Sequence, residues 1–167
     1  GLRFPTLELL LFLTLALAQS ARAQFTEVNY APAGVAWASS ECYGGVAARG
    51  NDGNTDGNWG GNSVTHTCDN EFQPFWEVFL AAPQTVGRVQ VWFRTDCCYD
   101  RNDALQLVIT DIGATELARV PLANPFSKTP SSPWTAVNFS PPIANAYAVR
   151  VTRANVGFVS LAEAQVI

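Results

Sequence analysis

The sequence has few basic residues, and this scarcity excludes several kinds of partner. Lys and Arg together number 10 against 14 Asp and Glu, the net charge is −4, and Lys128 is the only lysine. Nucleic-acid binding needs a stripe of basic side chains that neutralises phosphates and releases counterions, and polybasic attachment to anionic membranes has the same need. No such stripe is present. We therefore expect no nucleic acid as the partner and no polybasic attachment to a membrane.

Residues that often carry catalysis are scarce as well. His66 is the only histidine, and the sequence contains no G-x-S-x-G and no C-x-x-C. A serine-hydrolase triad, a histidine-based zinc site and a thioredoxin-like redox motif are therefore unsupported. Paired carboxylates such as Asp100 and Asp103 could in principle serve a glycosidase, but they lie in a polar surface loop. We expect that the protein is not an enzyme.

No apolar run is long enough to span a membrane. The longest, residues 9–18 (LLLFLTLALA), has ten residues, which is too short for a bilayer core of about 30 Å. Residues 19–23 (QSARA) follow with a small-x-small cleavage pattern. We therefore interpret residues 1–23 as a secretory signal peptide and residues 24–167 as one secreted, extracellular domain, the alternative being an N-terminal anchor or a buried helix. Residue 1 is Gly rather than Met, so we expect the natural chain to begin upstream.

Helical periodicity is nearly absent after residue 24, and short β-rich runs take its place. Val89, Val91 and Phe93 alternate with polar or amphipathic residues, so these three should face a core. The predicted strands are Phe75–Leu80, Arg88–Phe93, Ala104–Thr110, Glu116–Val120, Thr135–Phe139, Ala146–Thr152 and Phe158–Ile167. Many short strands separated by Pro, Gly, Asn and Ser predict an all-β sandwich or barrel.

Two segments do not have a strand pattern. Residues 39–70 are rich in Gly, Asn, Asp and Ser, and residues 121–134 are rich in Pro. A loop of about thirty residues in a compact domain is usually functional or held by something. Within it, Asp52–Asn58 alternates short oxygen-bearing side chains with Gly, which suits either a calcium site or a pair of tight turns. The residues alone do not decide between these two.

A second polar segment follows the predicted strand that ends at Phe93. Arg94 and Arg101 offer planar donors seven residues apart, and Asp96 can orient one of them through a charge-assisted pair. Such donors suit the hydroxyls and ring oxygen of a neutral sugar, and equally a carboxylate or a phosphate. The plainer alternative is a surface ion-pair cluster of little energetic value.

Adjacent cysteines lie inside that segment. Cys97 and Cys98 could close a strained eight-membered ring, pair with Cys42 and Cys68, or form a redox dithiol. A ring would present a rigid, compact, apolar face. Four cysteines in a secreted chain permit two disulfides in all.

The order of these motifs resembles that of one protein family. His66 is followed by Arg94-x-Asp96 and then, after four residues, by Arg101, with the adjacent cysteines between the two arginines. This pattern is similar to that of the F-type lectins, fucose-binding lectins on a discoidin-like sandwich. Further matching motifs, within a likeness that covers residues 28–167, are Asp52-Gly53-Asn54, Ser63-x-x-His66-Thr67, Pro74-Phe75-Trp76 and Ala162-Glu163. The resemblance implies an antiparallel β-sandwich of the jelly-roll type that binds L-fucose and fucosylated glycans or glycoproteins.

The resemblance also implies roles for single residues. His66, Arg94 and Arg101 would hydrogen-bond the sugar, with Asp96 beside them, and a Cys97–Cys98 ring would pack against the pyranose face. Trp59 and Tyr43 would border the pocket for the 6-methyl group. A structural Ca²⁺ would take backbone oxygens of Arg49 and Ala162 and oxygens of Asp52, Asn54, Ser63 and Glu163. We then expect Cys42 and Cys68 to pair, because their loops must converge near His66.

The sequence departs from the family pattern in three respects. The loop from Ser39 to Arg49 carries Cys42 and Tyr43, which leaves saccharide specificity beyond fucose open. Val64 and Ala162 stand where the family often has a cysteine pair, and because both cysteines are missing together the fold need not suffer. Phe79 stands where the family usually has an acidic residue, which puts one structural ion pair in doubt. Two other functions stay open: a generic discoidin-type domain that binds protein or phospholipid, and an accessory sugar-binding module of a larger secreted protein. Homo-oligomerisation also stays open.

Overall fold

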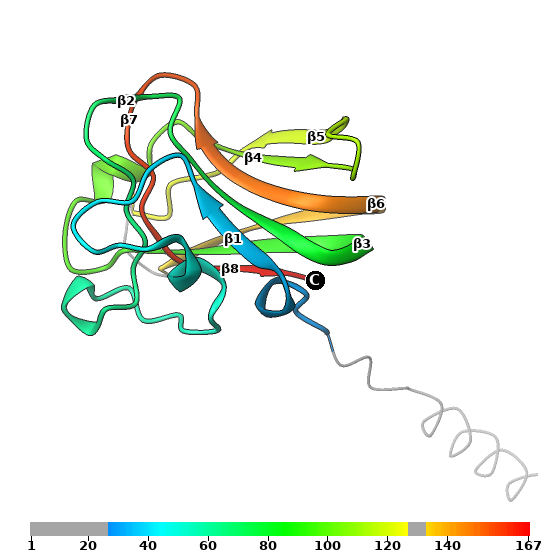
Figure 1. The fold of residues 1–167 in the computed structure, drawn as a ribbon, viewed down its shortest axis with the longest axis horizontal. Helices are drawn as coiled ribbons and strands as arrows, with labels where there is room; N and C mark the ends of the chain where they lie inside the picture. The colour runs from blue at the N-terminus through cyan, green and yellow to red at the C-terminus, as the bar shows by residue number, and fades with distance from the viewer. Residues whose placement is uncertain (1–26, 127–132) are drawn as a thin grey trace, which may run out of the picture.

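Two long bent strands run the length of the domain and form its frame (Figure 1). The computed structural model describes residues 27–126 and 133–167, so the predicted signal peptide, residues 1–23, lies outside the described residues. The strands are β1 (Val35–Ala38), β2 (Glu71–Phe72), β3 (Phe75–Phe93), β4 (Leu105–Thr110), β5 (Glu116–Pro121), β6 (Trp134–Arg153), β7 (Val156–Gly157) and β8 (Leu161–Val166). The short 3₁₀ turns are η1 (Ala31–Ala33), η2 (Ala47–Asn51), η3 (Trp59–Gly61) and η4 (Tyr99–Asn102). No helix within the two described ranges is long and apolar enough to cross a membrane.

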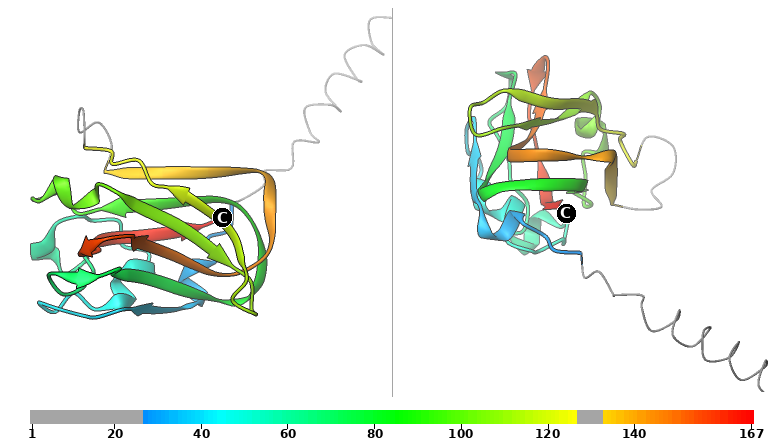
Figure 2. Two further views of the ribbon diagram at one scale, coloured as in Figure 1. Left: turned by 90° about the horizontal axis from the view of Figure 1, so that it is seen from above. Right: turned by 90° about the vertical axis from the view of Figure 1, so that its right-hand side faces the viewer.

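Strands β3 and β6 pair antiparallel and carry the chain from one layer of the sandwich to the other. The first half of β3 pairs with β1 and with the second half of β6, which also pairs with β4. The second half of β3 pairs with β8 and with the first half of β6. Register shifts between Phe79 and Arg88 mark the bend, where extra residues let a strand turn between layers. Figure 2 shows the two layers from the side, and the predicted antiparallel β-sandwich is confirmed.

The predicted strand boundaries need correction at the bends. The sequence predicted Phe75–Leu80 and Arg88–Phe93 as separate strands, but both belong to β3. In the same way Thr135–Phe139 and Ala146–Thr152 both belong to β6. Pro and Gly near the bends broke the alternation in the sequence, whereas the ladder continues past them through bulges. The last strand begins at Leu161 rather than Phe158, and β1, β2 and β7 were not predicted.

The core lies between the two layers. Val89, Val91 and Phe93 are at most 1% exposed, which confirms the predicted inward face of this strand. Trp76 is fully buried and its Nε1 donates to the carbonyl of Ala47, at 2.8 Å. This bond holds η2 against the core, and η2 in turn begins the polar loop that follows.

Candidate functional site

His66 is fixed from both sides by its backbone. Its carbonyl accepts from the N–H of Cys42, and its own N–H donates to the carbonyl of Gly45, both at 2.9 Å. A Cβ on Gly45 would lie 2.6 Å from the nitrogen of His66, so only glycine permits this close approach. The Cys42–Cys68 disulfide, predicted from the sequence and confirmed here, closes the same pair of segments.

The protonation of the His66 ring follows from its contacts. The side chain is buried, Nδ1 contacts the carbonyl of Thr67, and Nε2 lies 3.0 Å from Nη1 of Arg101. A carbonyl oxygen can only accept, so Nδ1 carries the hydrogen and Nε2 accepts from the guanidinium. Burial lowers the pKa of His66 below its ordinary value, and the neighbouring charge of Arg101 lowers that pKa further. His66 is therefore a neutral acceptor at physiological pH.

Three aromatic rings surround His66. The ring centroids of Tyr43, Trp59 and Phe158 lie 5.4, 5.7 and 5.5 Å from its own. Tyr43 and Trp59 were expected at the site, whereas Phe158 was expected in a strand. The hydroxyl of Tyr43 also donates to Asp69 at 2.7 Å, a second partner that no motif indicated.

Arg94 follows the last residue of β3 and is held by a bidentate pair. Its Nε and Nη2 donate to the two carboxylate oxygens of Asp96 at 2.7 and 2.8 Å. The hydrogen bonds from Arg94 lower the pKa of Asp96 to about 2. The guanidinium carbon lies 4.8 Å from the ring centroid of Trp59, whose backbone N–H donates to Asp96 at 3.3 Å. Asp96 thus orients Arg94 and leaves its Nη1 to donate elsewhere.

Arg101 lies in η4 and has a different environment. Its guanidinium carbon lies 4.2 Å from the ring centroid of Phe158, and Arg153 donates to its backbone carbonyl at 3.1 Å. The salt bridges found in the described ranges involve other arginines. Arg101 is therefore a cation that faces a neutral histidine rather than a carboxylate.

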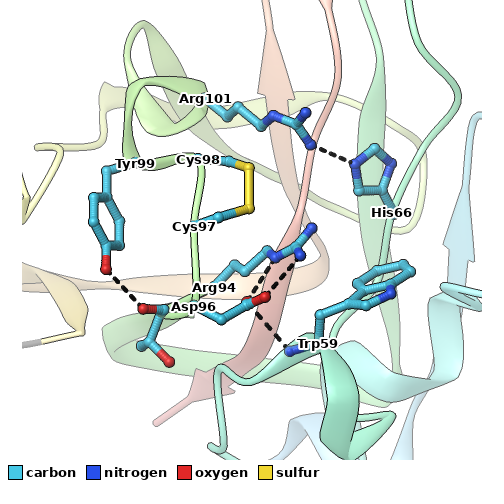
Figure 3. The surroundings of a disulfide bond; sticks show 9 residues. Trp59, His66, Arg94, Asp96, Cys97, Cys98, Tyr99 and Arg101 are labelled. Carbon is cyan, nitrogen blue, oxygen red and sulfur yellow. Dashed lines mark hydrogen bonds and ion pairs between the residues drawn. A yellow bond between two sulfur atoms is a disulfide. The ribbon is translucent and has the colours of Figure 1, made fainter.

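Cys97 and Cys98 form a disulfide between the two arginine side chains (Figure 3). Their Cα atoms are 3.8 Å apart, the spacing of a trans peptide. Cys98 takes a left-handed conformation with φ 67°, a conformation that costs of order 1–3 kcal/mol in a non-glycine residue. Arg94 and Arg101 both point towards the side where His66 and Trp59 lie. The disulfide, the two guanidiniums, the imidazole and the indole therefore border one space.

The Asp52–Asn58 segment is a series of turns closed by side chains. The side-chain oxygens of Asp52, Asn54, Asp56 and Asn58 each accept the backbone N–H two residues further on, at 2.8 to 3.0 Å. This accounts for the alternation that the sequence left undecided, and it uses one oxygen of each side chain. Gly57 lies against the end of β3 and accepts from the N–H of Thr95 at 2.8 Å. The turns thus reach the Arg94 segment.

Glu163 on β8 lies behind this series of turns and is fully buried. Its Oε2 accepts from the N–H of Gly53 at 3.2 Å, whereas Oε1 has no partner among the described residues. Burial, together with the charge of Asp52, raises the pKa of Glu163 to about 7. In the described part of the chain, no group of three or more His, Cys, Asp or Glu side chains is placed to hold a metal ion, so a cation here would need backbone and hydroxyl oxygens as well.

One protein family has a model that matches this chain. The model for the NedA-like, galactose-binding domain matches residues 49–151, which is more than half of the chain. A comparison with curated protein sequences finds no significant match.

Solved structures give closer likenesses. The lectin domain of lectinolysin, solved in complex with Lewis b antigen, is 32% identical, with 85% of this chain and 96% of that chain covered and a TM-score of 0.73. A fucose-binding module of Streptococcus pneumoniae is 31% identical, with 84% and 94% covered and a TM-score of 0.73. The fucolectin of striped bass (Morone saxatilis) serum is 24% identical, with 84% and 47% covered and a TM-score of 0.66, and it shares the fold.

Proposed function

The chain belongs to the NedA-like galactose-binding domain family, and on that premise we propose that it is a secreted, calcium-containing lectin that binds L-fucose and fucosylated glycans. Its structural neighbours are carbohydrate-binding lectin modules. One of them is described as fucose-binding, and another was solved with the Lewis b antigen. The convergence of His66, Arg94 and Arg101 around the Cys97–Cys98 disulfide carries the proposal.

Fucose is neutral, so its affinity must come from aligned hydrogen bonds and from burial of its apolar surface. Arg94 and Arg101 supply permanently charged donors, and charge-assisted hydrogen bonds are the stronger kind. Nε2 of His66 accepts from Arg101 in the free protein, and it can accept equally from a sugar hydroxyl. A hydroxyl placed between His66 and the arginines would then donate to the imidazole and accept from a guanidinium. Sugars that present this hydroxyl in the other orientation would leave these groups unpaired.

Side chains that border the same space would make the apolar contacts with the sugar. The sulfur atoms of Cys97 and Cys98 offer a rigid surface for one face of the pyranose ring. Trp59 and Tyr43, which both contact the His66 ring edge-on, are placed to border the 6-methyl group. Asp96 takes no direct role in this scheme and positions Arg94.

Calcium is the second part of the proposal. The unpartnered Oε1 of the buried Glu163 and the fully buried Ser63 are groups that suit a hard cation. The proposed ligands are backbone oxygens of Arg49 and Ala162 with oxygens of Asp52, Asn54, Ser63 and Glu163. A bound Ca²⁺ supplies charge that stabilises the Glu163 carboxylate and ties the turns to β8.

The other functions considered fit the loops less well. A domain that inserts into phospholipid usually displays apolar loop tips or a basic rim. The site between residues 52–63 and 94–101 instead has two arginines beside a buried histidine. Catalysis is not part of the proposal, because the grouped side chains offer donors and one neutral acceptor but no acid and base pair. Two disulfides are typical of a secreted domain.

Calorimetric titration with four sugars tests the proposal. We expect saturable binding of L-fucose in the presence of calcium, weaker binding of L-galactose, which replaces the methyl group with a hydroxymethyl group, and no binding of D-glucose or D-mannose. Equal heats for fucose and glucose, or no fucose binding by folded protein, would refute the lectin assignment.

A further inference from the structure

A cavity lies apart from the site formed by His66, Arg94 and Arg101. A cleft of about 800 Å³ opens on the outward face of the sheet formed by β3, β6, β4 and β5. Its volume lies within the roughly 300–1,000 Å³ of ordinary ligand clefts. None of His66, Arg94 and Arg101 lines it, so it is separate from the site described above. We call it the sheet groove.

The strand register explains which residues line the sheet groove. Glu77 of β3 lies opposite Arg150 of β6, which lies opposite Val108 of β4, which lies opposite Arg119 of β5. The neighbouring row of outward positions consists of Phe79, Ala148, Thr110 and Glu116. Residues between these rows point inward and make up the core, so the outward rows form a continuous surface across the sheet.

The floor of the groove is an ion pair between the buried Glu77 and the partly exposed Arg150. Arg150 donates through Nε and Nη2 to the two oxygens of Glu77 at 3.0 and 3.1 Å, and Glu77 is only 5% exposed. The guanidinium carbon of Arg150 lies 4.1 Å from the ring centroid of Phe75. The pair therefore presents a fixed array of remaining donors and acceptors towards the groove.

The charge of the lining is nearly balanced. Arg119 donates to Glu116 at 2.6 Å and to Gln106 at 2.9 Å, so this arginine of the lining, like Arg150, already has a carboxylate partner. The lining contains four carboxylates and three arginines in all. Phosphorylated, sulfated or nucleic-acid ligands would need an excess of unpaired cations. The charge pattern thus fits a neutral ligand.

Aromatic side chains supply the apolar part of the lining. Phe79 is 37% exposed, and its ring centroid lies 6.1 Å from that of Tyr147 in the next strand. Phe72 at the edge of the cleft is 69% exposed. Exposed rings next to a fixed polar array match the two surfaces of a pyranose, which has apolar ring faces and a polar rim.

We propose that the sheet groove is a second carbohydrate site that binds a neutral, linear oligosaccharide segment. Phe79 and Tyr147 stack on sugar rings, and Arg150 and Glu77 hydrogen-bond the hydroxyls at the floor. The volume of about 800 Å³ suits several linked rings rather than one terminal sugar. This proposal does not rest on fucose binding at the site formed by His66, Arg94 and Arg101.

The test is a nuclear magnetic resonance titration with fucose-free linear hexasaccharides built of glucose, mannose or galactose. We expect at least one of them to shift amide signals of outward residues on β3, β6 and β4, in a saturable way. Phe79→Ala and Tyr147→Ala should each weaken this binding at least tenfold without changing fucose affinity. Trp134→Ala is the matched control, since Trp134 is also aromatic and 36% exposed but lies outside the groove, and it should bind as the wild type does.

Four outcomes would overturn the proposal. One is the absence of shifts with every hexasaccharide at millimolar concentration. A second is shifts that map to His66, Arg94 and Arg101 instead. A third is unchanged binding in both groove variants, each shown to be folded by its melting temperature. A fourth is groove signals that move with protein concentration in the absence of sugar, which would identify the face as a contact between two copies of the chain.

Discussion

Two loops build the end of the molecule where sugar binding is proposed, and they are ordered by different forces. The loop of residues 52–63 is held by backbone bonds to its own Asp and Asn side chains and by one bond to buried Glu163. The loop of residues 94–101 is held by a bidentate ion pair, a disulfide and two cation–aromatic contacts. The first uses its polar atoms internally, whereas the second turns charged donors outward. On the proposed function, this contrast separates an anchoring loop, residues 52–63, from a binding loop, residues 94–101.

The two loops also touch. Asp96 of the binding loop accepts from the N–H of Trp59, and Thr95 donates to Gly57 of the anchoring loop. Apart from Trp59, which is proposed to border the sugar, the loop of residues 52–63 should therefore govern stability first and affinity indirectly, while the loop of residues 94–101 should govern affinity directly. The following experiments test that division.

Calcium removal should have the largest effect, and it should act on stability. A ligand bound only by the folded state stabilises it by about 2.7–4.1 kcal/mol at 100 to 1,000 times its dissociation constant. For a domain of this size that corresponds to a fall in melting temperature of roughly 10 °C when a chelator is added. Calorimetric melting with calcium and with chelator measures the effect.

Glu163→Gln is the matched variant for this experiment. It keeps the shape of the side chain but removes the buried charge, so the melting temperature should no longer respond to calcium. A wild-type protein whose melting is the same in calcium and chelator would contradict the anchoring role.

Opening the Cys42–Cys68 disulfide should have the next largest effect, and it should also act on stability. The sequence separation is 26, and loop entropy predicts a loss of about 3 kcal/mol in the free energy of unfolding when both cysteines become serine. The Cys97–Cys98 disulfide closes almost no loop, so the same replacement there should barely change denaturant unfolding but should weaken fucose binding. Equal destabilisation by the two double variants would remove this distinction.

Loss of either arginine should act mainly on affinity. Arg94→Ala and Arg101→Ala each remove a charge-assisted donor, at a cost of about 1.5–3 kcal/mol, roughly tenfold to 150-fold in the dissociation constant for fucose. Arg94→Lys should rescue poorly, because a lysine cannot donate in parallel to both oxygens of Asp96. Arg119→Ala, at an exposed ion pair on the sheet, is the control and should bind fucose normally. Fucose binding that survives Arg94→Ala in folded protein would break the assignment of this loop.

Acid should have the smallest effect, and it should act through His66. Burial holds the pKa of His66 below its ordinary value, so fucose affinity should stay flat from pH 8 to about 6.5 and decline only at lower pH, where protonation removes the Nε2 acceptor. The unfolded chain takes up this proton near pH 6.5, before the folded chain does, so the contribution of His66 to stability also falls as the pH drops through that value. The pKa of Asp96 is about 2, and its pair with Arg94 therefore persists throughout. Fluorescence titration of wild type and His66→Gln measures this, and a variant that keeps the acid response would exclude His66 as its source.

Much of this arrangement could be predicted from the amino-acid sequence alone. The alternation around Val91 predicted the buried face, because side chains of a strand point to opposite sides in turn. The spacing of Arg94, Asp96 and Arg101 on one short loop predicted the ion pair, since residues so close in sequence have few other partners.

The tertiary structure decided what depends on distant segments meeting. Phe158 lies under Arg101 although 57 positions separate them in the sequence, and no local pattern encodes that contact. The proton position on His66 follows from Thr67 and Arg101 together, and the orphaned oxygen of Glu163 from burial against the Gly53 turn. The sheet groove arises only when four strands align their outward rows. Local pattern thus determined which residues were buried or charged, whereas strand pairing and packing determined which of them share a site.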